Sequence, residues 1–115
     1  MPRELAMASI QSLTRRVLTR LQQVGPSDTP EADDTALALL KLRAAHSSLK
    51  KDRLVQWTEQ DIPDYAEEPY VQIAAFLAGA EFEKPVDPSW YLWGRAEIES
   101  ALQRYQTDTV RAEYF

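Results

Sequence analysis

The chain has 115 residues, of which 44% are hydrophobic and 27% are charged, a composition typical of one ordinary globular domain. Its net charge of -5 argues against binding to the phosphate backbone of nucleic acids, and the absence of cysteine excludes disulfides and thiolate chemistry. The longest apolar run, Ile73 to Ala80, is too short to span a bilayer, and no secretion signal is recognisable. We therefore expect a protein made in the cytoplasm, without a membrane partner.

The first expected element is an amphipathic helix between Met7 and Val24. Apolar residues recur there at steps of three and four, which places them on one face of a helix. They are Met7, Ile10, Leu13, Val17, Leu21 and Val24. Gly25 followed by Pro26 predicts the end of this helix, because glycine favours a helix C-terminus and proline cannot continue the helix.

A polar loop and a second helix follow. The helix is expected to begin at Asp33 or Asp34, since a carboxylate can accept hydrogen bonds from the free N–H groups of a helix start. Its apolar band is wider than a single contact needs, and it includes Ala36, Leu37, Leu39, Leu40, Leu42 and Leu49. The segment from Leu54 to Tyr65 has no helical period, which favours an extended crossover or a short hairpin laid over the helices.

The third and fourth helices have clearer signals. Pro69 is expected in the first turn of the third helix, and the residues from Tyr70 to Phe82 are apolar on almost every side, which predicts a central, buried helix. Asp87 as cap and Pro88 as first residue predict a fourth helix that continues to about Thr107.

We therefore predict an all-α fold, a small four-helix bundle made of two helical hairpins with the crossover after the second helix. Residues 1–107 would form the helical domain. Residues 108–115 have no stop signal and would either extend the last helix or leave the bundle as a C-terminal arm.

Residues able to carry chemistry are scarce. His46 is the only histidine, and no cysteine or second histidine could share a metal with it, so we expect it at the edge of a core or a subunit contact. Three pairs of carboxylates could in principle bind a divalent cation, but residues one or two positions apart do not share a helix face. These pairs are Asp33 with Asp34, Glu67 with Glu68, and Glu97 with Glu99. We expect no catalytic residue, no metal and no cofactor.

Basic residues gather in two clusters. The first comprises Arg15, Arg16 and Arg20, and the second comprises Lys50, Lys51 and Arg53. Neither cluster is interleaved with exposed aromatic residues, and the chain as a whole is acidic. We therefore expect both clusters to be solvated faces that pair with acidic neighbours, and we expect no nucleic-acid site.

The aromatic start of the fourth helix is the first candidate binding surface. A helix cannot turn Trp90, Tyr91, Leu92 and Trp93 toward one core, so we expect Leu92 and Trp93 to face outward, where they would contact a partner protein. The alternative is that the crossover around Trp57 and Ile62 covers them.

The C-terminal tail is the second candidate. It ends with Tyr114 and Phe115, and a free terminus usually frays unless it docks. We expect docking on a neighbouring subunit or on this chain, with Arg111 adding a charge-assisted contact.

The order of these elements resembles the head-to-tail adaptor proteins of tailed bacteriophages, also called head-completion or connector proteins, which include the tail accessory factors of short-tailed phages. The corresponding segments are Ile10 to Gly25, Asp34 to Leu49, Trp57 to Pro63, Tyr70 to Phe82 and Asp87 to Tyr105. The stretch from Pro69 to Phe82 is the most similar, with its apolar residues and alanines before a short turn. The sequence departs from the pattern where Phe82, Glu83 and Lys84 replace the glycine usual after the third helix.

The resemblance implies a structural virion protein located in the neck of the particle. It would form a homo-oligomeric ring, a dodecamer, that binds the portal protein above it and a tail or nozzle protein below it. DNA would pass through the channel as cargo only. An acidic chain suits that role, because a channel wall that attracted DNA would hinder its passage.

Two other classes of function stay open. One is a small cytoplasmic helical regulator that binds a single protein partner, such as an antitoxin or a sigma-factor antagonist. The other is a magnesium-dependent nucleotide hydrolase, although the paired carboxylate repeat of that class is missing from the sequence.

Overall fold

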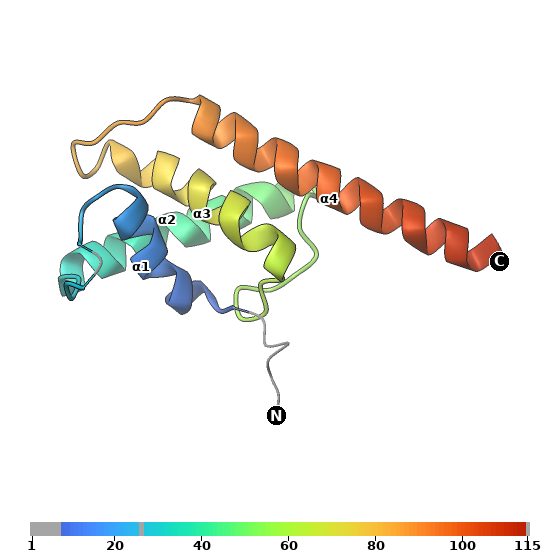
Figure 1. The fold of residues 1–115 in the computed structure, drawn as a ribbon, viewed down its shortest axis with the longest axis horizontal. Coiled ribbons are helices and arrows are strands. Elements are labelled where there is room, and N and C mark those ends of the chain that lie inside the picture. Colours follow the sequence, from blue (N-terminus) through green and yellow to red (C-terminus); the bar gives the residue numbers. More distant parts are fainter. Residues whose placement is uncertain (1–7, 26, 115) are drawn as a thin grey trace.

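A computed structural model describes residues 8–25 and 27–114, with side chains as far as Arg104. It contains four helices, α1 (Ile10–Arg20), α2 (Ala32–Lys51), α3 (Asp64–Gly79) and α4 (Ser89–Tyr114), and these described residues form no extended strand pair beyond one isolated bridge. The predicted all-α bundle is therefore confirmed (Figure 1).

Helix α3 is the centre of the bundle. It packs against each of the other three helices, while α1 also packs on α2, and α4 packs on α3 alone among the described helices. Nine of its residues are buried, more than in the other helices of which buried residues are known. They are Ala66, Pro69, Tyr70, Val71, Ile73, Ala74, Ala75, Ala78 and Gly79. The prediction of a central apolar third helix is thus confirmed.

The contact between α3 and α4 is close because of Gly94. A Cβ atom at this position would lie 2.6 Å from Cγ1 of Ile73 and 2.7 Å from the carbonyl oxygen of Pro69. Both distances are shorter than real Cβ contacts allow. The absence of a side chain at Gly94 therefore sets how closely the two helices approach.

The crossover between α2 and α3 is extended, as predicted, but it does not form a hairpin with itself. It pairs with the segment before α1, where Ala8 donates to the carbonyl of Ile62 (3.1 Å) and Ile62 donates to the carbonyl of Ala8 (2.8 Å). Ile10 donates in the same way to the carbonyl of Glu59 at 2.8 Å. The pairing anchors the crossover to the start of α1.

A second anchor is made by aromatic rings that pack in tilted and edge-on arrangements. The Trp57 ring lies 5.1 Å from the ring of His46 and 5.2 Å from the ring of Tyr70, and the His46 Nε2 is 2.9 Å from the Trp57 carbonyl oxygen. The Tyr70 hydroxyl donates to the carbonyl of Leu42 at 2.5 Å, and burial raises the pKa of this hydroxyl above its usual range. His46 is therefore a residue at the core edge, as expected.

The ends of the helices are not where glycine predicts them. Helix α1 stops at Arg20 and not at Gly25, and the turns after the first three helices each place a side-chain-bearing residue at positive φ. These residues are Gln22 (φ 59°), Arg53 (φ 62°) and Glu83 (φ 58°). The N–H of the next residue then donates to the carbonyl five positions earlier, at 2.8 Å in each helix, which is the Schellman arrangement.

The start of α3 also differs from the prediction. The helix begins at Asp64, directly after Pro63, and Pro69 lies inside it and not in its first turn. Asp64 and Glu67 occupy the first turn, where carboxylates suit the helix dipole. Pro69 has no backbone N–H to donate to the preceding turn, and it is buried, with its carbonyl oxygen at the close contact with Gly94.

Candidate partner-binding surface on helix α4

The rotation of α4 is fixed at its first turn. The Asp87 carboxylate accepts a hydrogen bond from the Ser89 N–H at 2.8 Å, and this backbone hydrogen bond lowers the pKa of Asp87. The predicted cap is therefore present, and the helix begins at Ser89, directly after Pro88.

The inner face of α4 packs on α3. Gly94 and Ile98 are buried, and the Tyr91 ring lies 5.7 Å from the ring of Phe76. Arg95 forms an ion pair with Asp52 after α2 at 2.8 Å, which ties the same face to the far end of the second helix. These contacts leave the opposite side of α4 free of the bundle.

That opposite side carries an apolar patch. Leu92 is 64% exposed and Trp93 is 44% exposed, and Ala96 one turn further along is exposed as well. We call these three residues the α4 outer patch. Their exposure shows that the crossover does not cover them, and its Trp57 ring packs instead on the rings of His46 and Tyr70. Leu92 and Trp93 therefore face outward, as the sequence predicts, and their role in binding a partner stays a prediction.

The C-terminal part of α4 leaves the bundle. Leu102 still packs against the core, and the helix then continues for twelve residues to Tyr114. At 1.5 Å per residue this extension is about 18 Å long. Figure 1 shows it projecting past the other three helices. Of the two sequence predictions for residues 108–115, the helical extension is the one observed as far as Tyr114.

The three tail residues predicted to dock on a partner lie in or next to this helical extension. Arg111 and Tyr114 belong to the helical extension, but their side chains lie outside the described residues, and so does Phe115. Docking by these three residues therefore stays a prediction.

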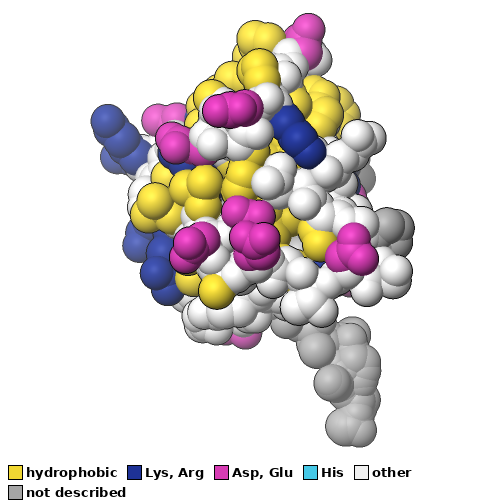
Figure 2. All heavy atoms as spheres, turned by 90° about the vertical axis from the view of Figure 1, so that its left-hand side faces the viewer, with side chains coloured by type: hydrophobic (Ala, Val, Ile, Leu, Met, Phe, Trp, Pro, Cys, Tyr) yellow, Lys and Arg dark blue, Asp and Glu magenta, His cyan; other side chains and the backbone are white. Residues whose placement is uncertain are grey.

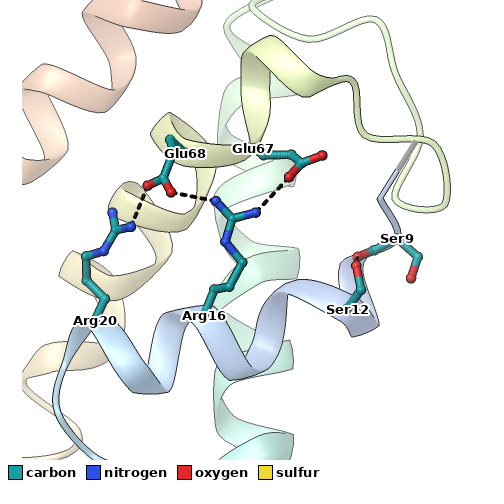
Figure 3. Close-up of polar contacts among 6 residues, drawn as sticks. All are labelled: Ser9, Ser12, Arg16, Arg20, Glu67 and Glu68. Carbon is teal, nitrogen blue, oxygen red and sulfur yellow. Dashed lines mark hydrogen bonds and ion pairs between the residues drawn. The ribbon is translucent and has the colours of Figure 1, made fainter. Parts of the chain in front are cut away.

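Two of the three arginines in the basic cluster on α1 pair with acidic residues of the same chain. Arg16 forms ion pairs with Glu67 at 2.7 Å and with Glu68 at 2.6 Å, and Arg20 forms one with Glu68 (Figure 3). Arg20 also donates a hydrogen bond to the side-chain oxygen of Gln72. The hydrogen bond from Arg20 is the largest cause that lowers the pKa of Glu68. Arg16 and Arg20 therefore pair with acidic neighbours, as expected, and they fasten α1 to α3.

Among the side chains that the structure describes, those of residues 8–25 and 27–104, no group of three or more histidine, aspartate or glutamate residues is placed to hold a metal ion. None of the helices in these ranges has both the length and the apolar content needed to cross a bilayer. Comparison with known protein families, with curated proteins and with solved structures finds no match.

Proposed function

We propose that the chain is a structural virion protein, a head-to-tail adaptor that assembles as a ring beneath the portal and joins the DNA-filled head to the tail. The observation that carries this proposal is the form of α4. The helix presents Leu92 and Trp93 on its outer face and then extends about 18 Å beyond the bundle.

The extension supports a role in assembly. A helix segment of three turns is marginal in water on its own, because helices need packing of one face to be stable. The part after Leu102 has no other helix of the bundle beside it (Figure 1). In the proposed ring, a neighbouring subunit or the portal would supply that packing.

The α4 outer patch supports the same role. Tryptophan is enriched among the residues that contribute most of the binding energy at protein interfaces, and an exposed leucine beside it adds apolar area to such a contact. Trp93 and Leu92 are two of only four large hydrophobic residues that are exposed among those described. Ring closure would place the patch against the next subunit, and a tail or nozzle protein would bind the completed ring.

The charge of the chain is consistent with a channel. A net charge of -5 gives little attraction for DNA, which in the proposed neck is cargo. This supports a passage function and argues against retention of DNA by the ring.

The proposal is tested with the portal protein encoded in the same genome. Purified portal rings are mixed with the chain, and the complex is measured by native mass spectrometry. Removal of residues 110–115 should abolish the complex while helical content falls only by the removed residues. Leu92→Ala and Trp93→Ala should weaken the complex at least tenfold each, the loss expected for an interface anchor.

Leu40→Ala is the matched control. Leu40 is 58% exposed, close to the 64% of Leu92, but it lies on α2 and outside the proposed contact. Its substitution should leave portal binding unchanged. Equal losses for Leu40→Ala and Leu92→Ala would contradict the assignment of the patch. A chain that does not bind the portal and binds a single cytoplasmic protein instead would favour the alternative function, a small helical regulator.

A further inference from the structure

Helix α2 has a face that nothing in the described chain covers. Its buried residues point toward α1 and α3, and a second stripe at steps of three and four points away from them. We call this stripe the α2 outer face, and it comprises the exposed residues Asp33, Ala36, Leu40, Ala44, Ser47, Ser48 and Lys51. Leu40, at 58%, is one of the most exposed large hydrophobic residues described.

The α2 outer face is charged at its two ends with opposite signs. Asp33 lies in the first turn and Lys51 in the last turn, and neither forms an ion pair or a hydrogen bond with another described residue. Figure 2 looks onto the end of the bundle where α2 begins, and there acidic side chains border hydrophobic ones while Lys and Arg gather mainly at one edge.

The basic residues in the middle of α2 are already engaged. Lys41 is 3.5 Å from Glu81 and Arg43 is 3.5 Å from Glu59, one on each flank of the helix. The charges left without a partner are therefore those at the two ends, and the centre of the α2 outer face is apolar or small.

We propose that the α2 outer face binds the same face of a second copy of this chain, with the two α2 helices antiparallel and their centres at Leu42. In this register Asp33 meets Lys51 of the second copy, and Lys51 meets its Asp33. Leu40 meets Ala44 of the second copy, so the largest side chain of each stripe lies against a small one.

The antiparallel direction follows from charge. A parallel pair in register would place Asp33 against Asp33 and Lys51 against Lys51. The antiparallel pair instead forms two Asp33–Lys51 ion pairs, and it also sets the two helix dipoles in opposite directions, which is favourable. Ala36, Ala44 and Ser47 are small enough for the helix axes to approach to about 8–10 Å. The contact is its own complement, as a two-fold interface must be.

This dimer is independent of the proposed adaptor function. Helix α3 separates α2 from α4, so a second copy can bind the α2 outer face whether or not a partner is bound to the α4 outer patch. A single helix pair buries less than the roughly 1,200 Å² of a standard stable interface. The dimer should therefore be weak, and salt should weaken it further because two of its contacts are exposed ion pairs.

The test is sedimentation equilibrium of the full chain at low salt over a concentration series. Wild type should show a monomer–dimer equilibrium. Asp33→Lys alone and Lys51→Asp alone should each weaken dimerisation about tenfold, because each replaces two attractions by two repulsions. The double variant, and an equimolar mixture of the two single variants, should both recover the dimer, because each again sets opposite charges against each other.

Two adjacent substitutions serve as matched controls. Asp34→Lys and Lys50→Asp change the same charges at the same helix ends, but the helical rotation of about 100° per residue takes them off the contact face. They should leave the dimer unchanged, and Leu40→Glu should abolish it while circular dichroism shows the fold retained.

Several results would overturn the proposal. They are a wild-type chain that is monomeric at every concentration, a mixture of Asp33→Lys and Lys51→Asp that stays monomeric, and control variants that dissociate as readily as the contact variants. Open-ended association beyond the dimer through α2 would also overturn it, since a two-fold contact closes at two copies. Loss of portal binding by Leu92→Ala tests the adaptor proposal only, and does not bear on the dimer.

Discussion

Substitution of Gly94 by alanine gives the sharpest prediction about the fold. The new Cβ would lie 2.7 Å from the Pro69 carbonyl oxygen, about 0.7 Å inside ordinary van der Waals contact. A backbone oxygen within a helix cannot turn away as a side chain can. Helices α3 and α4 would have to separate, and the packing around Ile98 would loosen with them.

Two opposing effects decide the size of the change. Replacing glycine by alanine inside a helix favours folding by about 1 kcal/mol, whereas overpacking a tight contact costs about 1–3 kcal/mol. With both Ile73 and the Pro69 carbonyl in the way, we take the upper part of that range. Gly94→Ala should therefore lower the free energy of unfolding by about 1–2 kcal/mol.

The assay is urea unfolding followed by circular dichroism, with Ala96→Gly as the control. Ala96 lies two residues along the same helix on its exposed side, so its substitution measures helix propensity without packing. It should cost about 1 kcal/mol. If propensity alone mattered, Gly94→Ala would stabilise the chain by about the same amount. An increase in stability for Gly94→Ala would therefore refute the close contact between α3 and α4.

Three further predictions concern a helix end, a salt bridge and a buried hydroxyl. Arg53→Gly should raise the free energy of unfolding by about 0.5–1 kcal/mol in urea unfolding, because the left-handed backbone at φ 62° strains any residue with a Cβ, and no gain would contradict the strain. The pKa of Glu68 is lowered mainly by the hydrogen bond from Arg20, so its contribution is present above the ordinary pKa of glutamate and is lost as the pH falls through the lowered one. When thermal unfolding is measured at a pH above the ordinary pKa of glutamate and again below the lowered pKa, Glu68→Gln should lose less stability than wild type between the two. The difference should be less than about 1 kcal/mol because Glu68 is half exposed, and identical losses in the two proteins would contradict this. Tyr70→Phe should destabilise the chain by about 1 kcal/mol in urea unfolding, since the hydrogen bond to the Leu42 carbonyl is buried, and an unchanged midpoint would show that this bond contributes nothing.

The sequence predicts those parts of the fold that depend on local chemistry. Asp87 and Pro88 together define a helix start, and the capping hydrogen bond to Ser89 is where they indicate it. The apolar surface on all sides of α3 likewise requires a central position. Both features can be recognised because the residues that cause them are adjacent or periodic in the sequence.

Other features depend on partners distant in the sequence and could not be predicted. Glu83 adopts the backbone conformation that glycine would favour, and nothing in its side chain indicates this. Pro69 lies inside α3, and its carbonyl oxygen is at the close contact with Gly94, twenty-five residues later in the chain. The pairing of Ala8 with Ile62 joins residues that are far apart in the sequence, and no local sequence pattern predicts it.

The candidate surface shows the same division. The outward direction of Leu92 and Trp93 follows from helix geometry once the inner stripe is known. The position of the α2 outer face was not predicted, because the wide apolar band of α2 does not reveal that Leu40 falls outside the core. Only the packing of α1 and α3 on the other side of α2 decides that.

The adaptor proposal depends most directly on one measurement, the mass of the complex formed when the full chain is mixed with portal rings from the same genome. The expected result is a single species in which a closed ring of this chain is bound to each portal, and this species should be lost when residues 110–115 are removed. A portal mass that stays unchanged at saturating concentrations of the chain would contradict it.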